Sequence, residues 1–118
     1  MSGQIDVREY SDHLRFTLSG DESLDFALRY WRRVGDDCGR KGMKKALIVS
    51  RLKGRLSSAD MNQVGGRVSQ YIRGFKIAFV SQESDDYGRQ LADIIARRSG
   101  GDVREFRSAN QAEGWLKR

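Results

Sequence analysis

A short apolar run in the middle of the chain, Ala46-Leu47-Ile48-Val49, limits the available folds most strongly. Lysines precede the run and a basic stretch follows it. Such a run predicts a strand buried on both faces, the kind found inside a parallel sheet. Sites in parallel sheets gather where strands end and helices begin. We therefore expect any functional site of this protein to lie just after Val49.

Other strands are predicted on both sides of this run. Residues 4–10 and 14–18 alternate between apolar and polar side chains, which is typical of half-buried strands. The three residues between them have the right length for an antiparallel hairpin turn, and the one histidine, His13, is expected to be an ordinary turn residue. Residues 75–81 form a second apolar run and predict another central strand. Residues 103–106 predict a short strand at a sheet edge.

Helical spacing of apolar residues fills the intervals between these strands. Capping residues place helix starts near Asp21, Ser57, Ser84 and Ser108. Gly65-Gly66 lies within the second helix, where it indicates a close backbone approach or flexibility. The order β-β-α-β-α-β-α-β-α predicts a single α/β domain over residues 1–118. Its sheet is expected to be mainly parallel, with about five strands, an N-terminal antiparallel hairpin and about four helices.

The first predicted helix has two apolar faces. Phe26 and Tyr30 are four residues apart and lie off the main apolar stripe, which runs through Leu24, Leu28 and Trp31. A helix of this kind needs cover from something besides its own sheet. We expect Phe26 and Tyr30 to be candidates for self-association as a homodimer, with an N-terminal strand or a loop as the alternative cover.

Length and composition exclude several classes of protein. A chain of 118 residues can bury a core without disulfides or a structural metal. Cys38 is the single cysteine, which excludes an intramolecular disulfide, and its acidic neighbours disfavour a reactive thiolate. No apolar run approaches the roughly 20 residues of a membrane span. The N-terminus has no signal pattern, so we expect a soluble, cytoplasmic protein.

The net charge of +6 is concentrated in one segment. Residues 29–55 carry ten basic and two acidic side chains, a net charge of +8. Such a segment attracts nucleic acid, anionic lipid or an acidic protein partner, and it is also common on ordinary solvated surfaces.

No catalytic set emerges from the motifs. The nucleotide-binding glycine signatures, a His/Cys zinc cluster and a serine–histidine–aspartate set are missing, so we expect no cofactor, no metal and no enzyme activity. Hydroxyl and amide side chains do gather at the ends of the two central strands. Helix N-termini at this edge can hold an anion or a phosphoserine, although serines also simply cap helices. The side chains are Ser50, Ser57 and Ser58 after one strand, and Ser81, Gln82 and Ser84 after the next.

The order of these features resembles the STAS domain group, and most closely its SpoIIAA-like branch, named after an anti-sigma-factor antagonist. The matching features are the hairpin and first helix, the run 46–49 leading past Gly54 to a helix near Ser57, and the strand 75–81. The tail matches as well, with the strand 103–106 followed by an A-x-x-W-L helix at residues 112–116.

The resemblance implies a non-enzymatic module that binds a partner kinase or switch protein. Members are phosphorylated on a serine where the helix after the central strand begins, which corresponds to Ser57 or Ser58. Leu56 stands here in place of the acidic residue before that serine pair, and Ala59 in place of the glycine after it. The fold also resembles lipid-binding CRAL-TRIO domains, which implies a small apolar ligand as another possibility.

We therefore expect a bacterial interaction or regulatory module that binds a protein partner or itself through the edge after the central strand. The alternatives are nucleic-acid or anionic-surface binding through residues 29–55, which is less favoured, and a carrier of a small apolar ligand. The candidate phosphoacceptor and partner-binding residues are Arg51, Lys53, Arg55, Ser57, Ser58 and Ser81.

Overall fold

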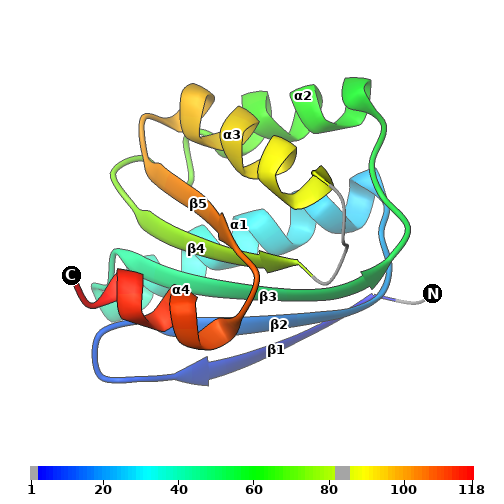
Figure 1. Ribbon diagram of the computed structural model, residues 1–118. Helices are drawn as coiled ribbons and strands as arrows, with labels where there is room; N and C mark the ends of the chain where they lie inside the picture. Colours follow the sequence, from blue (N-terminus) through cyan, green and yellow to red (C-terminus); the bar gives the residue numbers. More distant parts are fainter. Residues whose placement is uncertain (1–2, 82–85) are drawn as a thin grey trace.

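The computed structural model describes residues 3–81 and 86–118, in which five strands and four helices follow the predicted order (Figure 1). The strands are β1 (Gln4–Glu9), β2 (Leu14–Asp21), β3 (Lys45–Lys53), β4 (Lys76–Ser81) and β5 (Asp102–Phe106). The helices are α1 (Leu24–Lys41), α2 (Ser58–Val68), α3 (Tyr87–Ser99) and α4 (Ala109–Leu116). The predicted α/β class is confirmed.

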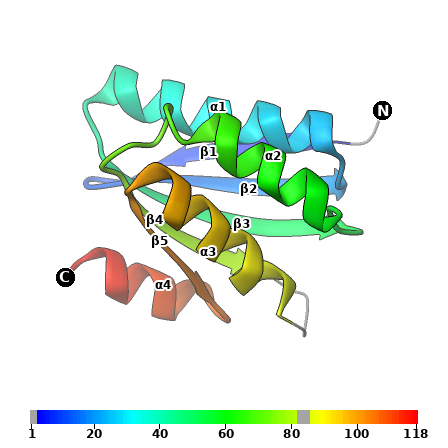
Figure 2. The ribbon, with the colours of Figure 1, turned by 90° about the horizontal axis from the view of Figure 1, so that it is seen from above.

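The strands lie in the sheet in chain order, β1-β2-β3-β4-β5. β1 pairs with β2 antiparallel, and each later pair is parallel. A right-handed crossover that always steps to the next strand in the same direction must place every connecting helix on one face. Accordingly α1, α2 and α3 lie together over one face, here called the inner face (Figure 2), while α4 returns to the opposite, outer face.

The inner face holds the larger core. Alternation in β2 directs Leu14, Phe16 and Leu18 toward the helices, and all three are buried. Trp31 of α1 is fully buried and stacks on Phe79 of β4, with ring centroids 6.3 Å apart. The amphipathic helices therefore cover this face from β1 to β5.

The outer face holds a smaller core under α4. Ala112, Trp115 and Leu116 of α4 pack on residues of β3 and β4, which are Leu47, Val49, Ala78 and Val80. β3 and β4 are thus buried on both faces, which explains their unbroken apolar runs and confirms that part of the sequence interpretation.

The paired glycines of α2 mark a close helix contact. A Cβ placed on Gly65 would lie 2.8 Å from Cγ2 of Ile94 in α3, a distance that packed atoms do not reach. At Gly66 the nearest atom, in the Arg98 side chain, would lie 3.5 Å away. The predicted close approach is therefore confirmed, and it belongs to Gly65.

Two predicted boundaries shift. β2 continues to Asp21, so α1 begins at Leu24 with Ser23 as its cap, and the Ser23 hydroxyl accepts from the Phe26 N–H at 3.1 Å. β3 continues past Val49 to Lys53. The parallel pairing of β2 with β3 continues as far as Asp21 and Lys53. The hydrogen bonds between the two strands outweigh the local preference of these residues for a turn. The predicted cap at Ser84 lies outside the described residues.

The second apolar face of α1 is covered by the chain itself. Phe26 and Tyr30 are 3% and 0% exposed, so the expectation of an apolar pair available for self-association is corrected. A Cβ on Gly3 would lie 2.6 Å from the Phe26 ring, and Ile5 and Val7 of β1 pack against the same core. The N-terminal strand is therefore the cover, as the alternative interpretation had it.

Candidate functional site

The end of β3 differs from the predicted basic loop. Arg51 and Lys53 are strand residues, paired in register with Ser19 and Asp21 of β2. Period-two alternation places Arg51 on the outer face with Leu47 and Val49. The irregular segment is therefore only residues 54–57, between β3 and α2.

This segment is held at both ends. The Lys53 carbonyl accepts from the Glu22 N–H at 2.8 Å, and Gly54 turns the chain with a φ of 85°. Leu56 is buried, and its N–H donates to the Tyr87 hydroxyl at 2.9 Å. The guanidinium of Arg55 lies over the Tyr87 ring at 5.3 Å from the centroid. An anchored turn therefore presents its outward side chains in a fixed arrangement.

We call the exposed part of this turn and the start of α2 the β3–α2 edge, comprising Lys53, Gly54, Arg55, Ser57 and Ser58. All five residues are exposed. Ser57 is the N-cap of α2, and its hydroxyl accepts from the Asp60 N–H at 3.1 Å. Ser58 is the first residue of the helix, where the dipole favours negative charge. The edge therefore combines basic side chains with a helix N-terminus.

Two of the remaining predicted serines, Ser50 and Ser81, are not part of this exposed surface. Ser50 and Ser81 are paired in register on β3 and β4. Ser81 is 7% exposed, and α3 lies so close that a Cβ on Gly88 would be 2.8 Å from the Ser81 Cβ. Gln82 and Ser84 lie outside the described residues.

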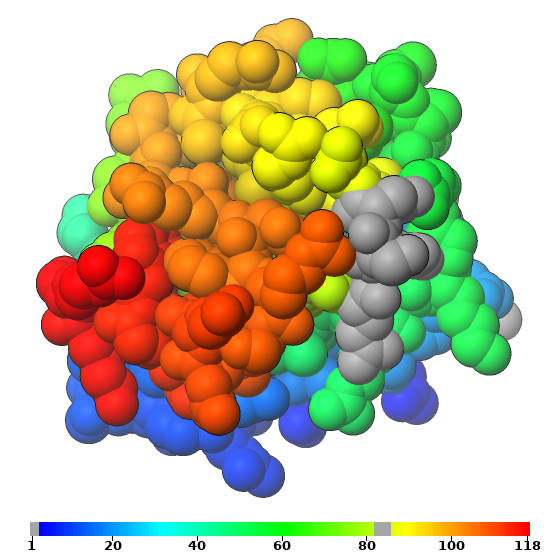
Figure 3. All heavy atoms as spheres, in the orientation of Figure 1, coloured from blue at the N-terminus to red at the C-terminus, as the bar shows by residue number. Residues whose placement is uncertain are grey.

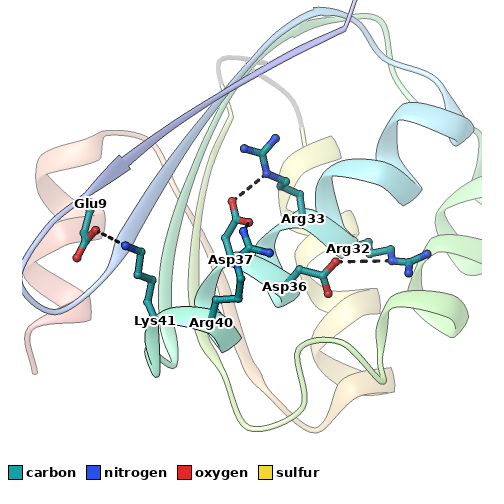
Figure 4. Close-up of polar contacts among 7 residues, drawn as sticks. All are labelled: Glu9, Arg32, Arg33, Asp36, Asp37, Arg40 and Lys41. Atoms are coloured by element: carbon teal, nitrogen blue, oxygen red, sulfur yellow. Dashed lines mark hydrogen bonds and ion pairs between the residues drawn. The ribbon is translucent and has the colours of Figure 1, made fainter.

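The basic segment 29–55 does not form one surface. On α1, Arg32 pairs with Asp36 at 3.7 Å, Arg33 and Arg40 both pair with Asp37, and Lys41 pairs with Glu9 at 3.0 Å (Figure 4). These side chains belong to a helix over the inner face, whereas Arg51 belongs to the outer face. The sheet thus separates the charges that a continuous nucleic-acid surface would need together, and carboxylates neutralise part of them.

An open hollow of about 650 Å³ lies at the start of α1. Its lining includes Asp21, Asp25 and Arg29 beside the apolar Phe26 and Leu28. Carboxylates and a guanidinium are costly to desolvate, so this lining suits an apolar ligand poorly.

A second hollow was not anticipated from the sequence. It measures about 280 Å³ and lies on the outer face of β1, β2 and β3. It is lined by Asp6, Arg8, Arg15, Thr17 and Arg51. The signal that could have found it is the hairpin register: alternation puts the residues between the apolar positions of both hairpin strands on one polar face.

Of the two buried side chains His13 and Cys38, His13 differs from the expectation of an ordinary turn residue, and Cys38 agrees with the expectation of an unreactive thiol. His13 lies in the predicted turn but is 2% exposed, stacked on Tyr10 at 4.8 Å, with Nδ1 2.8 Å from the Asp12 carboxylate. That hydrogen bond lowers the pKa of Asp12. Burial raises the pKa of the Cys38 thiol to about 12, and the charge of Asp37 adds to the shift, so the thiol is not nucleophilic at neutral pH.

The Tyr30 hydroxyl donates to Oε2 of Glu22 at 3.0 Å. Burial raises the pKa of Glu22, and the hydrogen bond from Tyr30 opposes that rise. This contact ties the end of β2 to α1 next to the β3–α2 edge, because Glu22 also donates its backbone N–H to Lys53. The two hydrogen bonds of Glu22 therefore fix the backbone at the start of the β3–α2 edge.

Two features are missing from the described part of the chain. No group of three or more His, Cys, Asp or Glu side chains there could hold a metal ion. No helix there is long and apolar enough to cross a lipid bilayer.

The chain is similar in structure to an uncharacterized protein of the DUF3478 family, from Shewanella loihica PV-4, whose crystal structure has a SpoIIAA-like fold. The TM-score is 0.56 at 15% sequence identity, and the match covers 98% of this chain and 94% of that one. No family model matches the sequence, and no curated protein matches it. The fold is thus SpoIIAA-like, which confirms the predicted resemblance at the level of fold.

Proposed function

We propose that this protein is a non-enzymatic interaction module that binds an acidic surface of a partner protein through the β3–α2 edge. The observation that carries the proposal is the anchored turn, which holds Lys53 and Arg55 exposed beside the N-terminus of α2. Exposed charges on a rigid support raise association rates and select partners of opposite charge. SpoIIAA-like folds are generally of this partner-binding kind, which supports the same conclusion.

Ser58 is the residue of this edge best suited to regulation by phosphorylation. Its side chain is exposed at the first helical position, where a phosphate is stabilised by the helix dipole. Ser57 already uses its hydroxyl to cap the helix, so its modification disturbs an existing hydrogen bond. Added negative charge at Ser58 reduces the positive potential next to Arg55, and we expect it to release an acidic partner.

The test is affinity capture from an extract of the organism that encodes the protein, comparing the wild type with Arg55→Glu and Ser58→Glu. We expect one set of proteins to be enriched by the wild type and lost from both variants. Arg73→Glu is the matched control, because Arg73 is an exposed arginine in the loop before β4. Far-ultraviolet circular dichroism shows whether all variants are folded.

A partner retained equally by the wild type, Arg55→Glu and Ser58→Glu contradicts the proposed surface. A partner lost from Arg73→Glu as well contradicts its specificity, since that result reflects net charge alone.

A further inference from the structure

We infer that the outer-face hollow is a binding site for a small organic phosphate monoester. We call it the three-arginine hollow, lined by Asp6, Arg8, Arg15, Thr17 and Arg51. It lies on the outer face of the sheet, whereas α1 packs on the inner face. The inference does not rest on the function proposed for the β3–α2 edge.

The sheet register brings the three arginines together from three strands. Arg8 of β1 lies directly opposite Arg15 of β2. Arg51 of β3 lies opposite Ser19, four residues along β2 from Arg15. Thr17 sits between Arg15 and Ser19 on the same face, opposite Asp6 of β1. The five side chains therefore line one hollow on the outer face of the sheet.

The arginines of the hollow form no ion pair with the described residues. None of Arg8, Arg15 and Arg51 has a carboxylate oxygen within 4.0 Å there, although arginines of α1 in the same chain are ion-paired. Like charges directly opposite each other on neighbouring strands destabilise a sheet. An anion between the arginines turns that repulsion into charge-assisted hydrogen bonds, and the guanidinium fork matches phosphate geometry.

The outer face leaves room for a ligand at this position. α4 covers β3 and β4 on this face, where its apolar residues pack on Leu47 and Val49. It reaches the hairpin at the turn, where Glu113 lies 4.0 Å from His13. In Figure 3 the red atoms of α4 cover part of this side, and the blue atoms of the hairpin lie beside them. Arg15 and Thr17 are half-buried, so they form the floor, whereas Arg8 and Arg51 are exposed and form the sides.

The lining favours a small ligand over a polyanion. The volume of about 280 Å³ is near the lower end for small-molecule sites. The Asp6 carboxylate repels the continuous negative charge of nucleic acid, and it accepts a hydrogen bond from a ligand hydroxyl. The Thr17 hydroxyl can donate to a phosphate oxygen. A phosphate group attached to a hydroxyl-bearing carbon skeleton satisfies each of these side chains.

The test is to titrate the full chain with glycerol 3-phosphate, inorganic phosphate and glycerol as separate probes. Backbone amide NMR monitors each titration. We expect glycerol 3-phosphate to shift amides of β1, β2 and the end of β3, and to bind about tenfold more tightly than inorganic phosphate through the added hydrogen bond to Asp6. Glycerol alone is expected to cause no shifts.

Arg15→Gln is the decisive variant, and Arg73→Gln is the matched control outside the hollow. Loss of one charged hydrogen-bonding partner is expected to weaken glycerol 3-phosphate binding by about tenfold or more, with no change in Arg73→Gln. Without ligand at low ionic strength, Arg15→Gln is expected to keep or raise the melting temperature, because it removes the repulsion with Arg8. A merely structural arginine gives the opposite shift.

Three results with the small probes overturn the inference. They are the absence of amide shifts in the hairpin with glycerol 3-phosphate, equal binding by Arg15→Gln and the wild type, and equal or tighter binding of inorganic phosphate. Tighter binding of a short single-stranded DNA at the same amides also overturns it, in favour of nucleic acid.

Discussion

The two faces of the sheet are built from the same five strands, yet they differ in how completely they are covered. The inner face receives all three crossover helices, because each connection steps in the same direction with the same hand. The outer face receives only the short α4, which packs over β3 and β4. Surface available for binding therefore arises where the connectivity leaves the sheet uncovered, on the outer side of the hairpin.

The β3–α2 edge lies at the boundary between these faces. Its anchors, Leu56 and Tyr87, belong to the inner core, while its exposed side chains project from it. The comparison thus predicts that stability depends mostly on the inner face and that binding depends on the edge and on the outer face. Four measurements of stability test the first part of that division.

Trp31→Ala is expected to have the largest effect. Trp31 is fully buried in the centre of the inner face, and removing its ring leaves a cavity against Phe79, so we expect a loss of about 3–5 kcal/mol in the free energy of unfolding. Urea denaturation followed by circular dichroism measures it. Trp31→Phe is the control and is expected to lose clearly less. A loss in Trp31→Ala no larger than that in Trp31→Phe contradicts the prediction.

Trp115→Ala makes the matched change on the outer face. Trp115 is 6% exposed, and the cationic groups of Lys76 and Arg104 lie 4.6 and 5.2 Å from the centroid of its ring. These side chains can close part of the space left behind, so we expect a loss of about 2–3 kcal/mol, smaller than at Trp31. The same denaturation experiment compares them. An equal or larger loss at Trp115 breaks the proposed ranking of the two faces.

The two glycines of α2 test packing on the inner face through smaller changes in stability, which are expected to have opposite signs. Gly66→Ala is expected to stabilise by about 0.5–1 kcal/mol, because alanine is the better helix former and its Cβ meets only ordinary contacts. Gly65→Ala is expected to destabilise by about 1 kcal/mol, because its Cβ collides with Ile94 and the gain in helix propensity is lost. Thermal melts of both variants measure the difference. Equal stabilisation by both would show that α2 and α3 are free to separate.

Glu22→Gln has the smallest expected effect and depends on pH. Since burial raises the pKa of Glu22 above 4.5, the folded protein holds this proton more strongly than the unfolded chain does. The protonation of Glu22 therefore stabilises the folded state fully below pH 4.5. This stabilisation disappears as the pH rises through the pKa of Glu22 in the folded protein. Glutamine stays neutral and can still accept from Tyr30. Relative to the wild type, the variant is therefore expected to gain on the order of 1 kcal/mol or less between pH 4 and 7. Urea denaturation across this range measures the gain, and a gain toward low pH contradicts the assignment.

Much of the fold was predictable from local patterns. The buried run 46–49, the alternation of Leu14, Phe16 and Leu18, and the capping serines Ser57 and Ser108 each depend on nearby residues, and each lies where it was expected. The positions that were predicted wrongly depend on distant partners. β3 extends to Lys53 because β2 is there to pair with it, and Phe26 and Tyr30 are buried because the N-terminal strand passes over them.

The candidate sites divide in the same way. The exposed serines and basic residues of the β3–α2 edge could be named from the order of strand, glycine and helix cap. The three-arginine hollow could be named only in part. The hairpin register pairs Arg8 with Arg15, but Arg51 lies on β3, beyond α1, and only the β2–β3 register makes it their neighbour. The buried position of His13 likewise depends on the way the turn packs, with Tyr10 stacked on its ring and Glu113 of α4 4.0 Å away.

Local patterns were enough to predict the order of the elements, the two strands buried on both faces and the starts of α2 and α4, because hydrophobic periodicity and capping act over a few residues. Only the tertiary structure decided which face each helix covers, where β2 and β3 end, and which charges meet. Those outcomes depend on the hand of the crossovers and on hydrogen bonds between strands far apart in the chain, and no local pattern contains them.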